Sequence, residues 1–245
     1  MVQGVHILGS RLINQGKELT LIADNVANIN THGFKRLTYG YEEVSAKVNG
    51  QNIGDYTKGI GVLVDFSAGT IESTDNPLDA AIQGDGFFTV DVNGQTQYTR
   101  NGHFALSSRG LLVNGSGQPV LDSAGGEIVI PLDAESVTIT AEGAIATENG
   151  VVAELGIFKF NKEDQQVLNR SGNGGFFAPD TANPERANED VVVMQGRLEV
   201  SNVEGIQEVV KLQELNKSYQ QAMRAIRQME DLEERAIRNI ATPAR

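Results

Sequence analysis

The chain has 245 residues, 40% of them hydrophobic, which is enough for one or two domains with a core of their own. It contains no cysteine, which excludes a disulfide framework, a thiolate metal site and a cysteine nucleophile. A formal net charge of -12 argues against nucleic-acid binding, which relies on Lys and Arg to neutralise phosphates, and no stretch is long and apolar enough to predict membrane insertion.

The N-terminal segment, residues 1–30, is predicted to form a helix with one apolar seam. Apolar residues recur at alternating spacings of three and four, as in the heptads of a coiled coil, and Gln15 fills the gap in register. Two interior glycines weaken such a helix by about 1 kcal/mol each, so we expect it to need a partner. Polar residues also interrupt the segment, so no cleaved signal peptide is predicted. The seam consists of Val5, Leu8, Leu12, Leu19, Ile22, Val26 and Ile29.

The middle of the chain, residues 77–190, changes to a period of two and is rich in turn residues, which predicts an all-β domain. Asn93-Gly94 predicts a type I′ turn that joins strands Phe87–Val92 and Gln95–Arg100. A second turn at Asn101-Gly102, leading into His103–Leu106, would extend this hairpin into a meander. Three further strands are expected at Glu127–Ile130, Val137–Thr140 and Ala153–Phe160.

The C-terminal segment, residues 203–245, is predicted to form a second long helix, because Ile206–Thr242 contains neither Gly nor Pro. Ser201 and Glu204 resemble a capping box, which places the helix start near Val203. Apolar residues again alternate at spacings of three and four, at Leu212, Leu215, Tyr219, Ala222, Ile226 and Met229.

The predicted fold class is therefore mixed α and β, with the two terminal helices pairing as a coiled-coil assembly domain and an all-β domain inserted between them. Residues 31–76 are expected to be a linker region and residues 191–202 a return linker.

Several short motifs suggest a family. The residues that end the first helix include Gly33, suited to the left-handed position after a helix, and Phe34, available to fold back on the last turn. As a whole, the segment 23–36 closely resembles the N-terminal signature of the bacterial flagellar rod and hook axial proteins, although Asp24 stands where that family often has a second Asn. The matching residues are Asn25, Ala27, Asn28, Thr31, Gly33, Phe34 and Lys35.

Two further segments resemble the same family, in the same order along the chain. The first runs from the glycine-rich turn at residue 84 to residue 104, and the second opens the C-terminal helix. The matching residues are Gly84, Gly86, Phe87, Tyr98, Arg100, Gly102, Phe104, Ser201, Asn202 and Val203.

The resemblance implies a structural subunit and not an enzyme, with no cofactor and no metal. It implies self-assembly through the terminal helices into a tubular drive shaft that transmits torque. The implied partners are copies of itself, other rod subunits, hook subunits and the flagellar type III export machinery. The implied location is the basal-body rod, which spans the periplasm, reached without cleavage of a signal. Chain length favours a subunit of the proximal rod, with the distal rod or hook as the alternative.

A protein of another class is the competing interpretation. The β domain could bind a ligand or hydrolyse cell wall, with the helices as a coiled-coil dimerisation stalk. The sequence gives this little support, because the histidines at positions 6, 32 and 103 lack metal-binding spacing and no serine lies in a nucleophile elbow.

Overall fold

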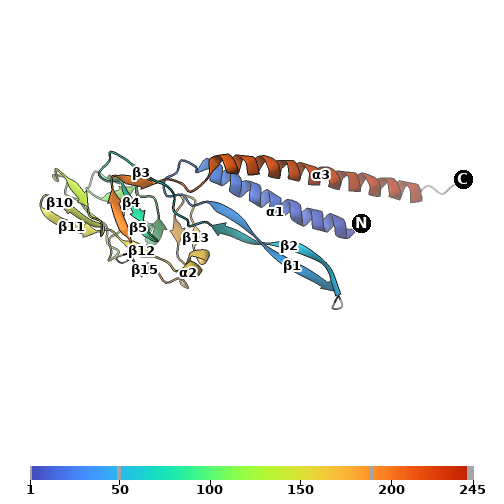
Figure 1. Ribbon diagram of the computed structural model, residues 1–245, viewed down its shortest axis with the longest axis horizontal. Coiled ribbons are helices and arrows are strands. Elements are labelled where there is room, and N and C mark those ends of the chain that lie inside the picture. The colour runs from blue at the N-terminus through green and yellow to red at the C-terminus, as the bar shows by residue number, and fades with distance from the viewer. Residues whose placement is uncertain (1, 49–50, 188–189, 242–245) are drawn as a thin grey trace. The chain divides into compact units, whose positions relative to one another are not determined.

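The computed structural model describes residues 2–48, 51–187 and 190–241. The fold is mixed α and β, and the chain divides into two compact units (Figure 1). Unit 1 is drawn from residues 1–27, 37–63 and 204–245, and unit 2 from residues 28–36 and 64–203. The chain therefore crosses between the units four times, after residues 27, 36, 63 and 203.

Unit 1 combines two helices with a β-hairpin. Its elements are α1 (Val2–Ala27), β1 (Leu37–Val48), β2 (Gln51–Val64) and α3 (Gly205–Ala241). Strands β1 and β2 form a two-stranded sheet, and α1 contacts both α3 and β1. With a rise of about 1.5 Å per residue, α3 is about 55 Å long and α1 about 39 Å.

The largest sheet of unit 2 has six strands in the order β13-β14-β6-β5-β12-β15, with antiparallel pairing throughout. At its centre, β5 and β6 form the hairpin predicted from Asn93-Gly94, and both turn residues have positive φ (55° and 81°). The strands are β5 (Phe87–Val92), β6 (Gln95–Thr99), β12 (Ile157–Lys159), β13 (Asn169–Arg170), β14 (Phe176–Phe177) and β15 (Glu185–Arg186).

Smaller antiparallel sheets complete unit 2. They are β11-β10-β9, β16-β4, β17-β3 and β7-β8. The short helix α2 (Lys162–Val167) is capped by the side chain of Asn161, which accepts a hydrogen bond from the NH of Asp164. The remaining strands are β3 (Ile71–Ser73), β4 (Ala80–Gln83), β7 (Phe104–Leu106), β8 (Leu112–Asn114), β9 (Val137–Ile139), β10 (Ala144–Thr147), β11 (Gly150–Glu154), β16 (Val192–Gln195) and β17 (Arg197–Glu199).

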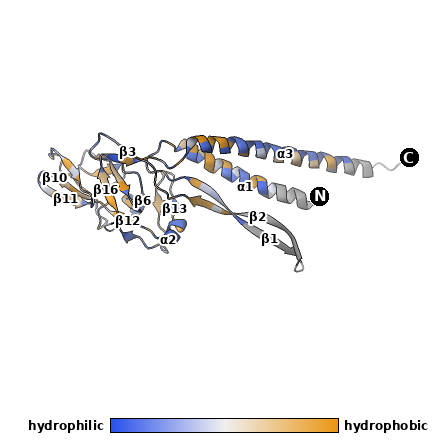
Figure 2. Cartoon of the chain, viewed as in Figure 1, coloured by the Kyte–Doolittle hydropathy of each residue, from blue (hydrophilic) through white to orange (hydrophobic). Residues whose placement is uncertain are grey.

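Two apolar clusters form the core of unit 2. The larger, which we call the aliphatic cluster, consists mainly of Ile, Val, Leu and Ala. It also contains Phe88 and Phe104, whose rings meet edge to face with centroids 5.2 Å apart. The second is aromatic and includes Phe87, Tyr98 and Phe176. Figure 2 shows orange, apolar stretches on strands of this unit such as β16. This unit thus has a core of its own, as expected of a domain.

The predicted meander is wrong in its second half. Strand β7 pairs with β8 and not with β6. The chain leaves the sheet after Thr99, and the carbonyl of Gly102 then accepts a hydrogen bond from the NH of Ala80. A Cβ at Gly102 would lie 1.7 Å from the carbonyl oxygen of Ala80, so the glycine permits a close backbone contact with β4 in place of a turn.

Other expected strands also differ in extent. The range Ala153–Phe160 is divided between β11 and β12, because Gly156 approaches Thr89 and Asp122 too closely for a side chain. The range Glu127–Ile130 pairs only through isolated bridges, and Val137–Thr140 is confirmed as β9 apart from its last residue.

Both predicted helix ends need correction. Helix α1 ends at Ala27 and not near residue 30, and Gly33 lies six residues beyond it. Gly33 does have positive φ (69°), and its lack of a side chain lets its backbone approach that of Arg100 and Asn101 closely. Helix α3 begins at Gly205, and the Ser201 hydroxyl accepts from the NH of Val203, so the capping box does not form.

Strands also occupy the segments for which linkers were expected. Residues 31–76 contain β1, β2 and β3, and residues 191–202 contain β16 and β17. Long polar strands without strict alternation are hard to tell from linkers by periodicity alone.

Candidate functional site

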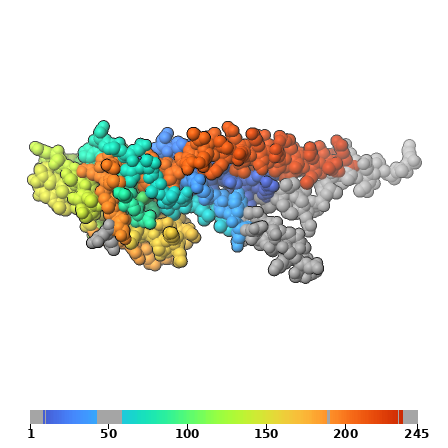
Figure 3. Space-filling view, viewed as in Figure 1, coloured from blue at the N-terminus to red at the C-terminus, as the bar shows by residue number. Residues whose placement is uncertain are grey.

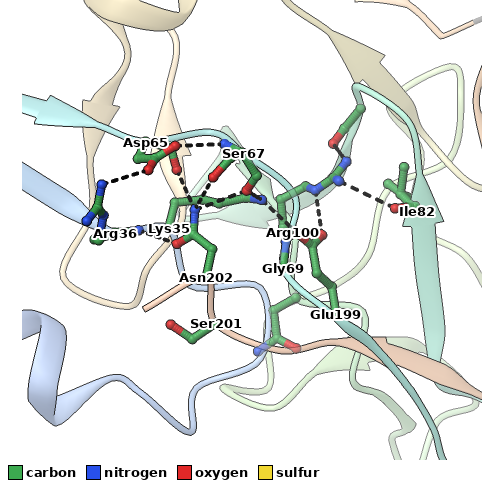
Figure 4. Close-up of polar contacts among 12 residues, drawn as sticks. Lys35, Arg36, Asp65, Ser67, Gly69, Ile82, Arg100, Glu199, Ser201 and Asn202 are labelled. Atoms are coloured by element: carbon green, nitrogen blue, oxygen red, sulfur yellow. Dashed lines mark hydrogen bonds and ion pairs between the residues drawn. The ribbon is translucent and has the colours of Figure 1, made fainter. Parts of the chain in front are cut away.

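Three of the family-like motifs meet in unit 2 around the carboxylate of Glu199, at the end of β17 (Figure 4). Its Oε1 accepts hydrogen bonds from Lys35 Nζ (2.7 Å) and from the NH of Gly69 (2.8 Å). Its Oε2 accepts from Arg100 Nε (2.8 Å). We call Lys35, Arg100 and Glu199 the Glu199 cluster. These contacts join residues 99 to 164 positions apart in the chain.

Arg100 also explains the glycine-rich turn before β5. Its Nη1 donates to the carbonyl oxygens of Gly84 (2.9 Å) and Gly86, and its Nη2 to that of Ile82 (3.4 Å). The guanidinium carbon lies 5.9 Å from the ring centroid of Phe87. Arg100 therefore holds the turn in place by satisfying three backbone carbonyls.

A second set of contacts forms a closed ring among Arg36, Asp65 and Asn202. The NH of Arg36 donates to Asn202 Oδ1 (2.7 Å), Asn202 Nδ2 donates to the carbonyl of Asp65 (2.8 Å), and the NH of Asp65 donates to the carbonyl of Arg36 (2.8 Å). An ion pair between Arg36 Nη2 and Asp65 Oδ2 (3.1 Å) adds to it. We call this the Asn202 ring.

The Asn202 ring lies close to the places where the chain crosses between the two units. Its three members each lie within two residues of one of the four crossings between the units, those after residues 36, 63 and 203. Within unit 2, the ring thus holds three of these four chain segments together. Ser67 contributes further contacts, because its carbonyl and its hydroxyl both accept from Asn202 Nδ2.

The Glu199 cluster is buried, with 3% of Lys35, 5% of Arg100 and 2% of Glu199 exposed. It contains two cations and one carboxylate. Burial lowers the pKa of Lys35, and the attraction of Glu199 only partly opposes this effect. Burial also tends to raise the pKa of Asp65, but hydrogen bonds from Ser67 and the charge of Arg36 outweigh it and hold that pKa below its ordinary value.

The other motif residues of unit 2 serve packing and turns. Phe34 is fully buried, and the Arg170 guanidinium lies 5.0 Å from its ring centroid. The hydroxyl of Thr31 donates to Asn28 Oδ1 (3.1 Å). Phe87 and Tyr98 belong to the aromatic cluster, Phe104 belongs to the aliphatic one, and Val203 is buried.

In unit 1, the motif residue Asn25 makes hydrogen bonds to two other elements. Its side chain, fully buried, brackets the backbone of Leu37: Nδ2 donates to the carbonyl (2.8 Å) and Oδ1 accepts from the NH (2.9 Å). Nδ2 also donates to Glu208 Oε2 (3.2 Å) on α3. Asn25 thus connects α1, β1 and α3, whereas its neighbour Ala27 is exposed.

The predicted seam residues with described side chains lie at intermediate burial or deeper. Ile22 is buried, whereas Leu12, Leu19, Val26 and all six α3 members are half-buried. The side chains of Val5 and Leu8 lie outside the described side chains. Other apolar residues of the helices remain exposed: Ile13 (63%), Val209, Val210, Leu232 and Ile206 (85%).

Metal-binding clusters are not found in the described parts of the chain. Residues 2–48, 51–187 and 190–241 hold no group of three His, Asp or Glu placed to bind a metal ion. Their helices are also too short or too polar to cross a membrane. His103 Nδ1 contacts Asp79 Oδ1 (2.8 Å), and its ring centroid is 6.5 Å from that of His32.

Sequence reasoning missed several residues that the structure makes central. Glu199, Asp65 and Glu208 were given no role, yet each bridges segments far apart in the chain. One signal was available for Glu199, which is a single charge between the apolar Leu198 and Val200 in a strand. A charge in such a position is rarely buried unless it is paired.

Comparison with protein families gives three matches. Residues 6–35 match the family described as "Flagella basal body rod protein". Residues 81–147 match "Flagellar hook protein FlgE/F/G D1 domain", and residues 194–239 match "Flagellar basal body rod FlgEFG protein C-terminal". The matched regions contain Lys35, Arg100 and Glu199, the three members of the Glu199 cluster.

Comparison with curated proteins gives relatives of nearly equal length. The flagellar basal-body rod protein FlgF of Rhizobium meliloti is 33% identical, over 98% of this chain and 98% of the relative. FlgF of Caulobacter vibrioides is 30% identical, over 94% and 95%. The flagellar basal-body rod protein FlgG of Bacillus subtilis is 34% identical, over 80% and 83%.

Proposed function

Since the chain belongs to the flagellar basal-body rod protein family, it is a structural subunit of the rod, and we propose that it is a FlgF-type subunit of the proximal rod. Near-complete coverage of the FlgF relatives supports this position. The FlgG relative, similar in identity, is covered less fully and makes the distal rod the alternative.

The terminal helices are the proposed assembly surface, with residues 1–30 and 203–245 as the assembly domain and residues 77–190 as the inserted domain. One observation carries this proposal: unit 1 leaves large apolar side chains on its surface, above all Ile206 at 85% exposure. Figure 3 shows α3 exposed along one side of unit 1. Coiled-coil packing against neighbouring subunits would bury these residues, and heterologous contacts that do not close generate a helical tube.

Within such a tube, the Asn202 ring has a mechanical role. Torque carried by the assembled helices passes to the inserted domain through the four chain crossings. Three of them are joined by hydrogen bonds among Arg36, Asp65 and Asn202. We assign the subunit no catalysis.

The proposed partners are copies of this chain, other rod subunits and hook subunits. Export through the flagellar type III machinery without signal cleavage would deliver the subunit to the periplasmic span of the basal body. The incompletely buried helices support this route, since helices that are weak alone unfold easily and gain stability in contact with neighbours.

A charge placed in the seam tests the assembly surface. Leu12→Asp should abolish incorporation into purified basal bodies, because it would bury a carboxylate between helices. The matched control is Thr20→Asp, which adds the same charge at an exposed site on α1. Circular dichroism should show unit 2 folded in both variants. Normal incorporation of Leu12→Asp would refute the proposal.

Copy number tests the position in the rod. Quantitative mass spectrometry of purified hook and basal-body complexes, scaled to the hook protein, should find a few copies of this chain per complex. A few tens of copies would assign it to the distal rod, and absence would remove it from the axial structure.

A further inference from the structure

Among the described side chains, two polar contacts link α1 to α3 within unit 1. Gln15 Nε2 donates to Ser218 Oγ (2.8 Å), and Asn25 Nδ2 donates to Glu208 Oε2 (3.2 Å). The two donors are ten residues apart on α1, and the two acceptors are ten residues apart on α3 in the opposite direction. Both contacts therefore specify one and the same antiparallel register.

The apolar seam alone does not specify that register. Its residues recur in heptads, so a slip of α3 by seven residues, about 10 Å along the axis, again places apolar residues opposite one another. A helix pair that relies on such a repeat has several registers of similar free energy unless polar residues distinguish them.

We infer that the pairs Gln15–Ser218 and Asn25–Glu208 select the register in which α1 and α3 pair, and so fix how far α3 extends beyond α1. Gln15 is only 6% exposed, so its amide must find a partner inside the helix pair. Even in the observed register, its Oε1 has no hydrogen-bond partner among the described residues. The site therefore costs stability, which fits a residue that confers specificity.

Both seven-residue slips break these contacts. One slip places Gln15 opposite Ala225, Asn25 opposite Leu215 and Ser218 opposite Ile22, so three polar side chains face apolar ones. The other slip places Glu208 opposite Glu18, which brings like charges together. Buried amides without partners and adjacent carboxylates are both unfavourable, so either slip is disfavoured.

The register has a consequence for assembly. In the observed register, Val2, the first described residue of α1, lies opposite residue 231 of α3, so residues 232–241 of α3 extend beyond the described part of α1. A slip would lengthen or shorten this overhang and alter the surface offered to neighbouring subunits. The inference concerns pairing within one chain and holds for a proximal or a distal rod position.

Engineered disulfides test the inference, and the cysteine-free chain makes them unambiguous. In the full-length protein, Leu12→Cys combined with Ala222→Cys reports the observed register. Leu12→Cys combined with Met229→Cys or with Leu215→Cys reports the two slips. Equilibration in a glutathione buffer gives an effective concentration for each pair, even where the helices form only part of the time.

We expect the in-register pair to exceed either slipped pair by about tenfold, and Gln15→Leu to reduce this ratio to about threefold or less. Helix content by circular dichroism should stay equal or rise, since leucine suits a seam. Glu208→Ala should reduce the ratio as well. The control Lys17→Leu adds the same side chain at an exposed site on α1 and should leave the ratio unchanged.

Two results would overturn the inference. In the first, the three pairs have equal effective concentrations in the natural background. In the second, Gln15→Leu leaves the ratio at its natural value, or lowers all three effective concentrations together, as a merely structural residue would. Neither result bears on incorporation into the rod, which Leu12→Asp tests separately.

Discussion

Units 1 and 2 use their polar and apolar residues in opposite ways. Unit 2 buries its large aromatic residues in two clusters and pairs its buried charges internally, around Glu199. Unit 1 leaves apolar residues such as Ile206 and Ile13 on its surface, and its helix seam is mostly half-buried. The contrast shows that unit 2 buries its apolar residues within one chain, whereas we propose that unit 1 gains further burial from neighbouring subunits.

The largest expected effect comes from breaking the internal pairing of unit 2. Glu199→Ala removes the only carboxylate of the Glu199 cluster and leaves Lys35 and Arg100 buried beside each other. Removing one partner of a buried ion pair costs about 3–5 kcal/mol. Urea unfolding of unit 2, followed by aromatic CD, should show this loss.

Glu72 offers a matched control for that measurement. It lies exposed on β3, directly opposite Leu198, so Glu72→Ala removes a carboxylate from the adjacent strand without uncovering a buried charge. Its effect should stay below about 0.5 kcal/mol. Equal losses in the two variants would show that the Glu199 cluster does not stabilise unit 2.

Opening the Asn202 ring should have the next largest effect. Asn202→Ala removes the acceptor for the NH of Arg36 and the donor to the carbonyl of Asp65. The unsatisfied groups should cost about 1–3 kcal/mol of unfolding free energy. Urea unfolding measures the loss, and hydrogen exchange should show faster exchange at Arg36.

The neighbouring Ser201 provides the comparison for this variant. Its hydroxyl accepts a single hydrogen bond of 3.3 Å, from the NH of Val203. Ser201→Ala should therefore cost less than Asn202→Ala, about 1 kcal/mol at most. A larger loss from Ser201→Ala would contradict the role assigned to the ring.

The third expected effect is a dependence of the unfolding free energy on pH. The pKa of Lys35 is lowered in the folded protein, so in the alkaline range below its ordinary value of 10.5 the unfolded state binds more protons than the folded state. The free energy of unfolding should therefore rise with pH through this window because of Lys35. The stabilising contribution of neutral Lys35 is complete above pH 10.5 and is lost as the pH falls through the lowered pKa of Lys35.

A difference measurement isolates this contribution. Tyr98 acts in the opposite direction, because burial raises its pKa and makes folding less favourable as the pH rises above 10. Lys35→Met removes the lysine and leaves Tyr98 unchanged. Subtracting the stability of Lys35→Met from that of the natural protein should therefore give a value that rises with pH. A flat difference would refute the lowered pKa.

The sequence alone was sufficient to predict several strands of unit 2 and the family to which the chain belongs. Asn93-Gly94 correctly predicted the β5–β6 hairpin, because a type I′ turn is a local property of the chain. The motifs correctly identified the rod family. The pairing of β7 with β8 was missed because the Gly102 contact with Ala80 joins segments that no local pattern relates.

In the candidate site, too, contacts between distant segments could not be predicted from the sequence. Lys35, Arg100 and Asn202 were recognised as motif residues, but their meeting around Glu199 and Asp65 depends on contacts between segments far apart in the chain. The seam of the terminal helices was predicted from its period, and its members with described side chains are buried or half-buried. Which apolar side chains neighbours cover in the assembled rod is a property of several chains and stays a prediction.

The smallest expected effect on stability comes from an exposed residue of unit 1, and it tests the difference between the two units most directly. Ile206→Ser replaces an 85% exposed side chain in unit 1, so the unfolding free energy of the unassembled subunit should change by less than about 0.5 kcal/mol. Incorporation into basal bodies should nevertheless fall, because a neighbour would bury this residue. Gln213→Ser, at an exposed polar site of α3, should change neither quantity. If Ile206→Ser is incorporated as efficiently as Gln213→Ser, this part of α3 faces solvent in the rod, and the assembly surface must be sought elsewhere on unit 1.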